Sequence, residues 1–153
     1  MSLQSITDYQ YRFGQPQAAH RDPLAPLKVL LVDGDSQTFD AIEQVQKQRG
    51  IPIECIWITS AFKALINLKA IEPDILIAEL GMAHVDGYDL LRTVRENHPP
   101  GTLMLVGVTA VPPSQIALLG NVPADTTLVQ KPVPMDWFHG YFASHIALHT
   151  STD

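Results

Sequence analysis

The chain has 153 residues, a formal net charge of −6 and a single cysteine. Its length allows one domain with a sizeable core, and its 46% hydrophobic and 17% charged residues exclude a disordered chain. The ten Lys and Arg form no cluster, which excludes a nucleic-acid-binding surface. No stretch approaches the ~20 apolar residues of a membrane span. A lone cysteine and the lack of an export signal fit a reducing compartment, so we expect a cytoplasmic protein.

Residues 1–27 contain scattered Gln and Pro without a helical period, and they predict a tail or linker. Tyr9, Tyr11 and Phe13 alternate, so this segment is also suited to lie as an extended strand on a sheet edge or a partner. We place the folded domain at residues 28–149 and a short C-terminal tail at 150–153.

From Lys28 onward, short apolar runs typical of buried strands alternate with stretches of helical period. The predicted strands are residues 29–32, 51–58, 74–79, 102–108 and 126–130. The predicted helices are one capped by Asp35 or Ser36 and ending at Gly50, one capped by Thr59 or Ser60 and ended by Pro73, residues 88–97, a short helix opened by Pro112-Pro113, and residues 135–148. The second of these helices has Phe62, Leu65 and Ile66 on one face.

Five strands alternating with helices favour an α/β fold in which helices cover both faces of a five-stranded parallel sheet. Right-handed crossovers then give a doubly wound, flavodoxin-like arrangement with an N-terminal extension. In such folds the functional site lies at the carboxyl ends of the strands, near the switch point of the strand order. The residues at or just past a predicted strand end are Asp33, Asp35, Glu79, Thr109 and Lys131.

Five short motifs stand at these strand ends and in the loops beside them. They are Val32-Asp33-Gly34-Asp35, the run from Pro73 to Glu79, Val85-Asp86-Gly87, Val108-Thr109-Ala110 and Lys131-Pro132. Glu79 and Thr109 are 30 positions apart, and Thr109 and Lys131 are 22 apart. In order and spacing, these motifs resemble the CheY-like receiver domain of bacterial response regulators, over residues 28–149.

The resemblance implies a site at which an aspartate at the end of the third strand accepts a phosphoryl group. Mg²⁺, held by acidic residues and a backbone carbonyl, neutralises the developing charge in that family. Here Asp33 matches the first acidic residue of the pair. Thr109 matches the hydroxyl that follows the phosphoryl group, and Lys131 matches the lysine that pairs with it.

Three other positions depart from the family pattern. The second acidic residue falls on Gly34, the phosphoacceptor on Glu79 and the aromatic switch residue on Leu128. Ala83 also stands where the family often has proline. Glutamate carries its carboxylate over 1 Å farther out, and a displacement of about 1 Å can cost 10²-fold in rate. Together these losses predict a degenerate pseudo-receiver in which neither Mg²⁺ nor another cofactor is required.

Two readings of Glu79 follow from this. In the first, Glu79 is a passive carboxylate paired with Lys131, and the pair only stabilises the fold. In the second, the longer side chain imitates a phosphorylated aspartate by placing negative charge near Thr109 and Lys131. Asp35 completes the acidic pocket but is also placed to cap the first helix.

The histidines and the cysteine carry weaker signals. His145 and His149 are spaced as zinc ligands on a helix can be, but no third ligand lies near them in sequence. His84 and His98 are isolated, and Cys55 lies within a predicted strand as an inert core residue. We therefore predict no metal site.

The last predicted helix has more large apolar side chains than one face can bury. They include Trp137, Phe138, Tyr141 and Phe142. Part of this stripe must cover the sheet, and the surplus predicts a surface for a protein partner or for a second copy of the chain.

We therefore expect a two-component signalling module without enzymatic activity that acts through protein–protein contacts independently of phosphorylation. A histidine kinase or a downstream effector is the expected partner, and neither nucleic acid nor membrane is. The alternative is a working phosphoacceptor that uses Mg²⁺ and a displaced carboxylate. A sensor that binds a small ligand in the acidic pocket is a third possibility.

Overall fold

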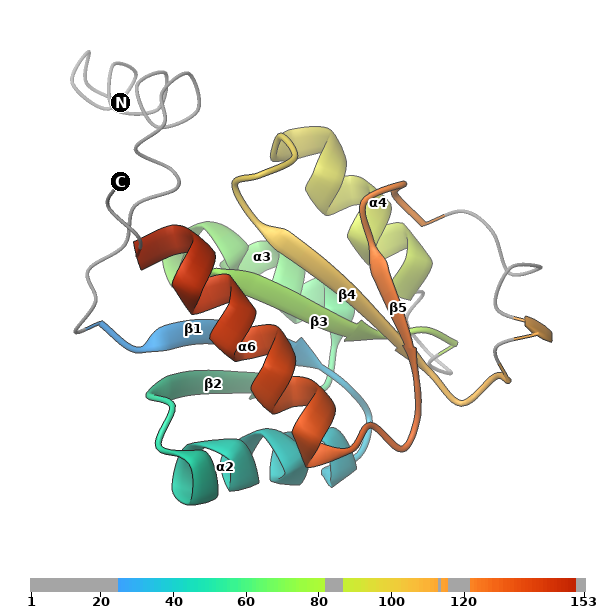
Figure 1. Ribbon diagram of the computed structural model, residues 1–153. Helices are drawn as coiled ribbons and strands as arrows, with labels where there is room; N and C mark the ends of the chain where they lie inside the picture. Colours follow the sequence, from blue (N-terminus) through green and yellow to red (C-terminus); the bar gives the residue numbers. More distant parts are fainter. Residues whose placement is uncertain (1–24, 82–86, 113, 116–121, 151–153) are drawn as a thin grey trace, which may run out of the picture.

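The computed structural model describes residues 25–81, 87–112, 114–115 and 122–150 (Figure 1). The strands are β1 (Leu27–Val32), β2 (Ile53–Ile58), β3 (Ile75–Glu79), β4 (Met104–Thr109) and β5 (Thr127–Gln130). The long helices are α2 (Gln37–Arg49), α3 (Ala61–Ile71), α4 (Gly87–Asn97) and α6 (Met135–Thr150). Most of the short helix predicted after Pro112-Pro113, and the aromatic residues of the N-terminal tail, lie outside the described residues.

The strands form one parallel sheet in the order β2-β1-β3-β4-β5. β1 pairs with β2 on one side and with β3 on the other, so that Val32 is the register partner of both Ile58 and Ala78. The predicted five-stranded, doubly wound parallel sheet is therefore confirmed. The strand order switches direction between β1 and β3, which places Asp33 and the end of β3 at the switch point.

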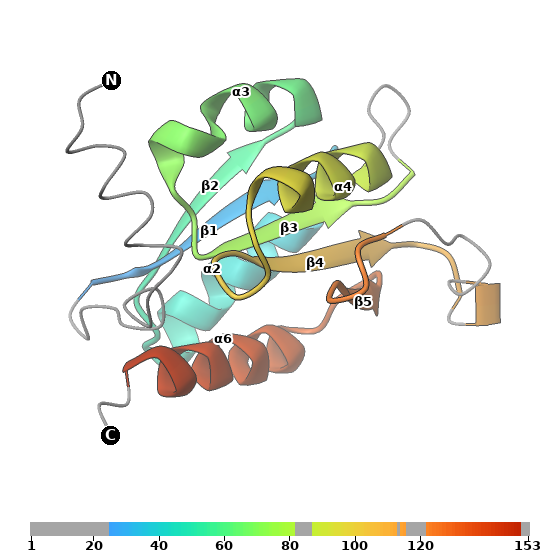
Figure 2. The same cartoon turned by 90° about the horizontal axis from the view of Figure 1, so that it is seen from above.

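Helices cover both faces of the sheet in two layers (Figure 2). α2 and α6 pack on one face, where Ile42, Phe138 and Phe142 are fully buried against side chains of β1 and β3. α3 and α4 pack on the other face, where Ala64 and Leu91 lie in a second buried cluster. Because both faces are covered, the central strands read as continuous apolar runs.

The helix ends follow the predicted capping signals. Ser36 is the N-cap of α2 but makes no side-chain cap hydrogen bond, and the neighbouring Asp35 carboxylate accepts from the Gln37 N–H at 2.9 Å. Gly50 ends that helix in the left-handed conformation that favours glycine. Ser60, the second of the two predicted caps, accepts from the Lys63 N–H at 3.2 Å and so begins α3.

The buried face of α3 is not the one that its large side chains suggest. Phe62, Leu65 and Ile66 do share one face, but that face is exposed. The buried residues are Ala61, Ala64 and Leu68. Two of these three buried residues are alanines, and the bulky stripe lies on the solvent side.

The last helix also differs from its sequence prediction. Phe138 and Phe142 are fully buried in the core and cannot belong to an exposed surface, whereas Trp137 and Tyr141 are half-buried. The first strand begins two residues before its predicted start, and Leu27 is fully buried. Among the described residues, no helix combines the length and apolar character that crossing a membrane requires.

Candidate functional site

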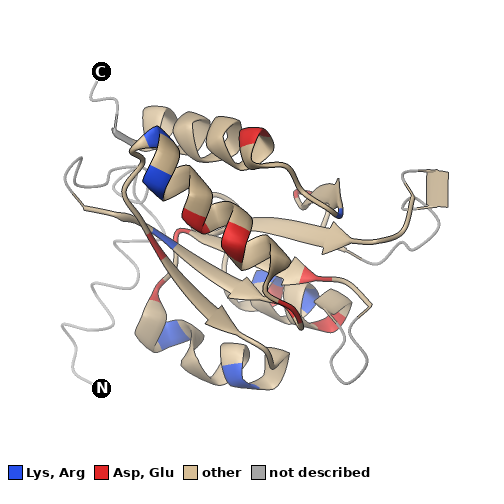
Figure 3. Cartoon of the chain, turned by 90° about the horizontal axis from the view of Figure 1, so that it is seen from below, with Lys and Arg blue, Asp and Glu red and all other residues tan. Residues whose placement is uncertain are grey.

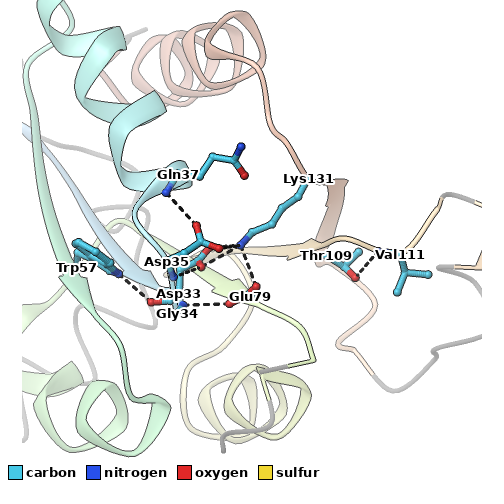
Figure 4. A network of polar contacts seen from close by, with 9 residues as sticks. All are labelled: Asp33, Gly34, Asp35, Gln37, Trp57, Glu79, Thr109, Val111 and Lys131. Carbon is cyan, nitrogen blue, oxygen red and sulfur yellow. Dashed lines mark hydrogen bonds and ion pairs between the residues drawn. The ribbon is translucent and has the colours of Figure 1, made fainter. Parts of the chain in front are cut away.

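An ion-pair network occupies the carboxyl ends of β1, β3 and β5 (Figure 4). Asp33 follows β1, Glu79 is the last residue of β3, and Lys131 follows β5. The ammonium Nζ of Lys131 lies 2.9 Å from both carboxylate oxygens of Asp33 and 2.9 Å from Oε2 of Glu79. The third carboxylate, Asp35 Oδ2, is 3.4 Å from the same nitrogen. One ammonium thus lies among three carboxylates, leaving the cluster with a surplus of negative charge.

The members of this network differ in their exposure to solvent. Asp33 is fully buried, and the Lys131 side chain is only 8% exposed. Glu79 is partly buried, whereas Asp35 is mostly exposed. The contacts of Lys131 with Asp33 and Glu79 therefore act with little solvent screening, and its contact with Asp35 is weak.

Each oxygen of the Glu79 carboxylate has its own partner. Oε2 accepts from Lys131, and Oε1 accepts a hydrogen bond from the backbone N–H of Gly34 at 3.0 Å. Gly34 therefore lacks an acidic side chain, but its backbone N–H donates a hydrogen bond to Glu79, the residue at the phosphoacceptor position. Sequence reasoning missed this contact, because any non-proline residue offers a backbone N–H and none is marked by its side chain.

The surroundings move the pKa values of the paired groups in different directions. Burial raises the pKa of Asp33 above its ordinary value, although the Asp35 N–H and Lys131 act to lower it. Burial also acts to raise the pKa of Glu79, but the Gly34 N–H and Lys131 outweigh it and hold that pKa below its ordinary value. For Lys131, burial lowers the pKa, and the two carboxylates more than compensate, so that it is raised. Glu79 is therefore the better-stabilised anion of the pair.

Neighbouring groups hold Asp33 and Lys131 in position. The indole N–H of Trp57, on β2, donates to the backbone carbonyl of Asp33 at 2.9 Å, and its ring stacks on Phe39 of α2. The backbone N–H of Lys131 donates to the carbonyl of Thr109 at 2.7 Å, which ties the end of β5 to that of β4. The sequence places Trp57 on the neighbouring strand but does not reveal its hydrogen bond.

Gly87 allows the start of α4 to lie against the end of β3. A Cβ atom on Gly87 would be 2.2 Å from the backbone oxygen of Glu79 and 3.3 Å from Cα of Leu80. Only glycine fits such a close approach to backbone atoms. The Asp-Gly pair in the sequence is the signal from which this constraint could have been read.

Thr109 and Leu128 lie near the network but not within it. Thr109 is buried, and its hydroxyl oxygen accepts a hydrogen bond from the Val111 N–H at 3.1 Å. The Glu79 carboxylate accepts hydrogen bonds from Lys131 and from the Gly34 N–H, not from this hydroxyl. Leu128 lies over Gly107 of β4, where a Cβ would be 3.0 Å from its Cδ2 atom. The structure thus brings together Asp33, Asp35, Glu79 and Lys131, with Thr109 turned toward its own loop.

Three carboxylates of the network, those of Asp33, Asp35 and Glu79, would hold the Mg²⁺ ion that the family resemblance implies. Oxygen atoms of Asp33, Asp35 and Glu79 lie within 4.8 Å of one another, so the carboxylates alone are close enough. However, the Lys131 ammonium already lies among them, and one Glu79 oxygen is taken by the Gly34 N–H. Mg²⁺ demands near-ideal octahedral oxygen geometry, so it would have to displace the Lys131 ammonium from these oxygens.

The remaining predicted positions carry no comparable cluster. The rings of His145 and His149 stack at a centroid distance of 4.1 Å, and His149 Nδ1 is 2.8 Å from the His145 carbonyl. Burial lowers the pKa of His98 and raises that of Cys55 to about 12, which keeps this thiol protonated. Ala83 and His84 lie outside the described residues. Within the described ranges, Asp33, Asp35 and Glu79 form the one group of metal-ligating type.

Comparison with known proteins bears on the identity of this site. The response regulator receiver domain family matches residues 29–139. The transcriptional regulatory protein TrcR of Mycobacterium tuberculosis is 29% identical over 84 residues, which are 55% of this chain and 32% of that protein. An uncharacterized 14.6 kDa protein of Leptolyngbya boryana is 30% identical over 87 residues, which are 57% of this chain and 65% of that protein. The chain thus spans less than two thirds of either relative.

Solved structures support the same assignment at the level of fold. A response regulator from Thermotoga maritima superposes with a TM-score of 0.63 at 18% identity, over 80% of this chain and 99% of that one. The chemotaxis response regulator CheY4 of Vibrio cholerae gives a TM-score of 0.64 at 16% identity, over 79% of this chain and 99% of that one. With the CheY-like strand order and the family match over most of its length, the chain belongs to the response regulator receiver domain family.

Proposed function

We propose that this receiver domain signals without being phosphorylated, through contacts with other proteins. The observation that carries the proposal is the closed network around Glu79. Lys131 and the Gly34 N–H engage both oxygens of the carboxylate at 2.9 and 3.0 Å. The acceptor position therefore already holds a fixed negative charge that neither phosphate nor a metal ion supplies.

The network supports a single signalling conformation that does not depend on phosphoryl transfer. Glutamate places its charge at the acceptor position all the time, and its lowered pKa keeps it ionised. With Gly34 in place of an acidic side chain, the site has lost one of the acidic residues through which the family holds Mg²⁺ for phosphoryl transfer. We therefore assign the domain no enzymatic activity and no cofactor.

The proposed partners follow from the family and from the composition. TrcR is by its name a transcriptional regulator, and one similar solved domain comes from a signal transduction histidine kinase of Syntrophus aciditrophicus. A histidine kinase or a downstream effector is the corresponding class of partner here. Trp137 and Tyr141, which stack at 5.0 Å, are the part of the predicted α6 surface that solvent reaches.

A measurement of intact mass tests this proposal. The full chain is incubated with Mg²⁺ and a small acyl phosphate beside a repaired Gly34→Asp, Glu79→Asp variant. Gly34 has no left-handed backbone conformation, so its backbone does not itself require glycine. We expect only the repaired protein to gain a phosphoryl group.

The alternative function, a working phosphoacceptor, has one observation in its favour, the proximity of three carboxylates. A phosphoryl group on the natural chain would establish it and refute our proposal. Mapping the modified residue would then identify the carboxylate that accepts the phosphoryl group.

A further inference from the structure

Helix α3 carries a stripe of large apolar side chains on its solvent side. Phe62 is 69% exposed, Ile66 62% and Leu65 38%. Their spacing of i, i+3 and i+4 brings them together on one helical face. Within the described ranges, the other exposed large hydrophobic residue is Leu148, on the opposite side of the sheet.

This stripe does not contribute to the fold of the domain. The helix already packs on the sheet through Ala61, Ala64 and Leu68, which are buried. An 11-residue helix therefore has two apolar faces, and the one with the bulkier residues faces outward. Contiguous exposed apolar groups of this kind, rimmed by polar residues, mark interaction sites.

The exposed charges within α3 are cationic. Lys63 and Lys69 are exposed, no Asp or Glu occurs from Ala61 to Ile71, and the exposed Glu72 follows as the C-cap of the helix (Figure 3). Lys69 lies one turn beyond Leu65 and Ile66, at the end of the stripe. A local positive charge is notable in a chain whose formal charge is −6.

We infer that this face of α3 binds an amphipathic helix of a partner protein, in which acidic residues flank the apolar stripe. Apolar residues at i, i+3, i+4 and i+7 of the partner would cover Phe62 and Ile66. Flanking Asp or Glu would then face Lys63 and Lys69. The inference concerns a surface separate from the Glu79 network, and it holds whether or not the domain is phosphorylated.

Charge argues against the two other occupants of this face. A second copy of the chain would bring the same two lysines and no acid on its own α3, and like charges across an interface are unfavourable. Residues 1–24 of this chain contain two Asp and two Arg, so they offer no acidic surplus. An acid-flanked helix from another protein satisfies both the apolar and the cationic part of the surface.

Two matched synthetic peptides test the inference on the full chain. Both are helical, about 15 residues long, with Leu at i, i+3, i+4 and i+7; one has Glu at the flanking positions and the other has Lys. Binding is measured by fluorescence anisotropy of the labelled peptides at low and at moderate salt. We expect the Glu peptide to bind at least about tenfold more tightly than the Lys peptide, with the difference shrinking as salt is added.

Three variants locate the binding site. Phe62→Ser, Ile66→Ser should weaken binding of the Glu peptide by about tenfold or more, because both side chains are removed from the stripe. Lys63→Glu, Lys69→Glu changes no apolar group and should reverse the preference between the peptides. Leu148→Ser, at the 75% exposed residue of α6, is the control and should leave binding unchanged. Thermal unfolding confirms that each variant is folded.

Several results would overturn the inference. Equal binding of the two peptides would remove the charge argument, and full binding by the Phe62→Ser, Ile66→Ser variant would place the peptide elsewhere. A dimer in sedimentation that this variant abolishes would make a second copy the occupant. Tighter peptide binding after deletion of residues 1–24 would instead make the chain's own N-terminal segment the occupant.

Discussion

Replacement of Lys131 by methionine tests whether the network at the strand ends stabilises the fold. Methionine keeps an unbranched side chain of similar length but has no ammonium, with sulfur in place of the Cδ methylene. The change leaves Asp33, which is fully buried, and the partly buried Glu79 without their shared counter-charge. Both had an ammonium nitrogen at 2.9 Å.

The expected loss follows from the burial of these groups. Removing one partner of a buried ion pair costs about 3–5 kcal/mol, because it leaves an uncompensated charge in the interior. Asp35 adds little, since an exposed contact at 3.4 Å is largely screened. Domains have a free energy of unfolding of about 5–15 kcal/mol, so the variant should fold but be severely weakened.

The loss should also depend on pH in a definite direction. Without Lys131, the native-state pKa of Asp33, which burial already raises, rises further, and that of Glu79 rises as well, so the native state of the variant takes up protons more readily than that of the wild type. The variant therefore regains stability as pH falls from neutral toward those pKa values. The difference in unfolding free energy from the wild type is largest near neutral pH and narrows in mild acid.

Urea unfolding followed by tryptophan fluorescence measures this difference at neutral pH and in mild acid. Lys47→Met, at an exposed position of α2, is the matched control and should change the free energy of unfolding by less than about 0.5 kcal/mol. Combining Lys131→Met with Asp33→Asn completes a double-mutant cycle that isolates the coupling of the pair. A loss below about 1 kcal/mol, or one that does not vary with pH, would show that solvent screens the network and that our reasoning is wrong.

Three further changes address the supporting structure. Gly87→Ala places a Cβ 2.2 Å from the Glu79 backbone oxygen and should lower the free energy of unfolding by about 1–3 kcal/mol. Gly140→Ala, with nothing within 4 Å of its Cβ, should raise it by about 0.5–1 kcal/mol, and equal urea midpoints for the two variants would contradict this. Glu79→Gln should destabilise the domain at pH values above the unfolded carboxyl pKa, and its difference in unfolding free energy from the wild type should vanish as pH falls through the lowered native pKa. Urea titrations across the acidic range measure this, and two stability curves that stay parallel would show that the native carboxylate is not stabilised. Phe138→Ala should cost about 3–5 kcal/mol because the ring is fully buried, and Trp137→Ala clearly less; calorimetric melting temperatures that fall in the opposite order would place the wrong ring in the core.

Much of the fold could be predicted because its signals are local. Short apolar runs, such as Val29 to Val32, indicate strands, and the helical periods between them indicate helices. The described strands and long helices begin and end within one or two residues of the predicted positions. The handedness of the crossovers and the rule for switch points then bring Asp33 and Glu79 to one edge of the sheet. Neither step requires knowledge of how the side chains pack.

The geometry of the site could be predicted only in part. The types and positions of Asp33, Glu79 and Lys131 indicate that they meet, but not that one ammonium contacts all three carboxylates of the pocket. The Gly34 N–H that binds Glu79 is invisible to an argument from side chains. Thr109 was predicted at the strand end, yet its hydroxyl is bound within its own loop.

The sequence by itself determines the order of the elements, the parallel sheet and the set of charged residues at its carboxyl edge, because these follow from local periodicity and chain topology. The tertiary structure alone decides which helix faces are buried. Phe138 is in the core while the equally apolar Phe62 is exposed, since burial depends on the shape of the opposing surface and not on hydrophobicity alone. The same dependence on neighbours from distant strands places the Lys131 ammonium among the carboxylates, where it makes the acceptor position a closed ion pair.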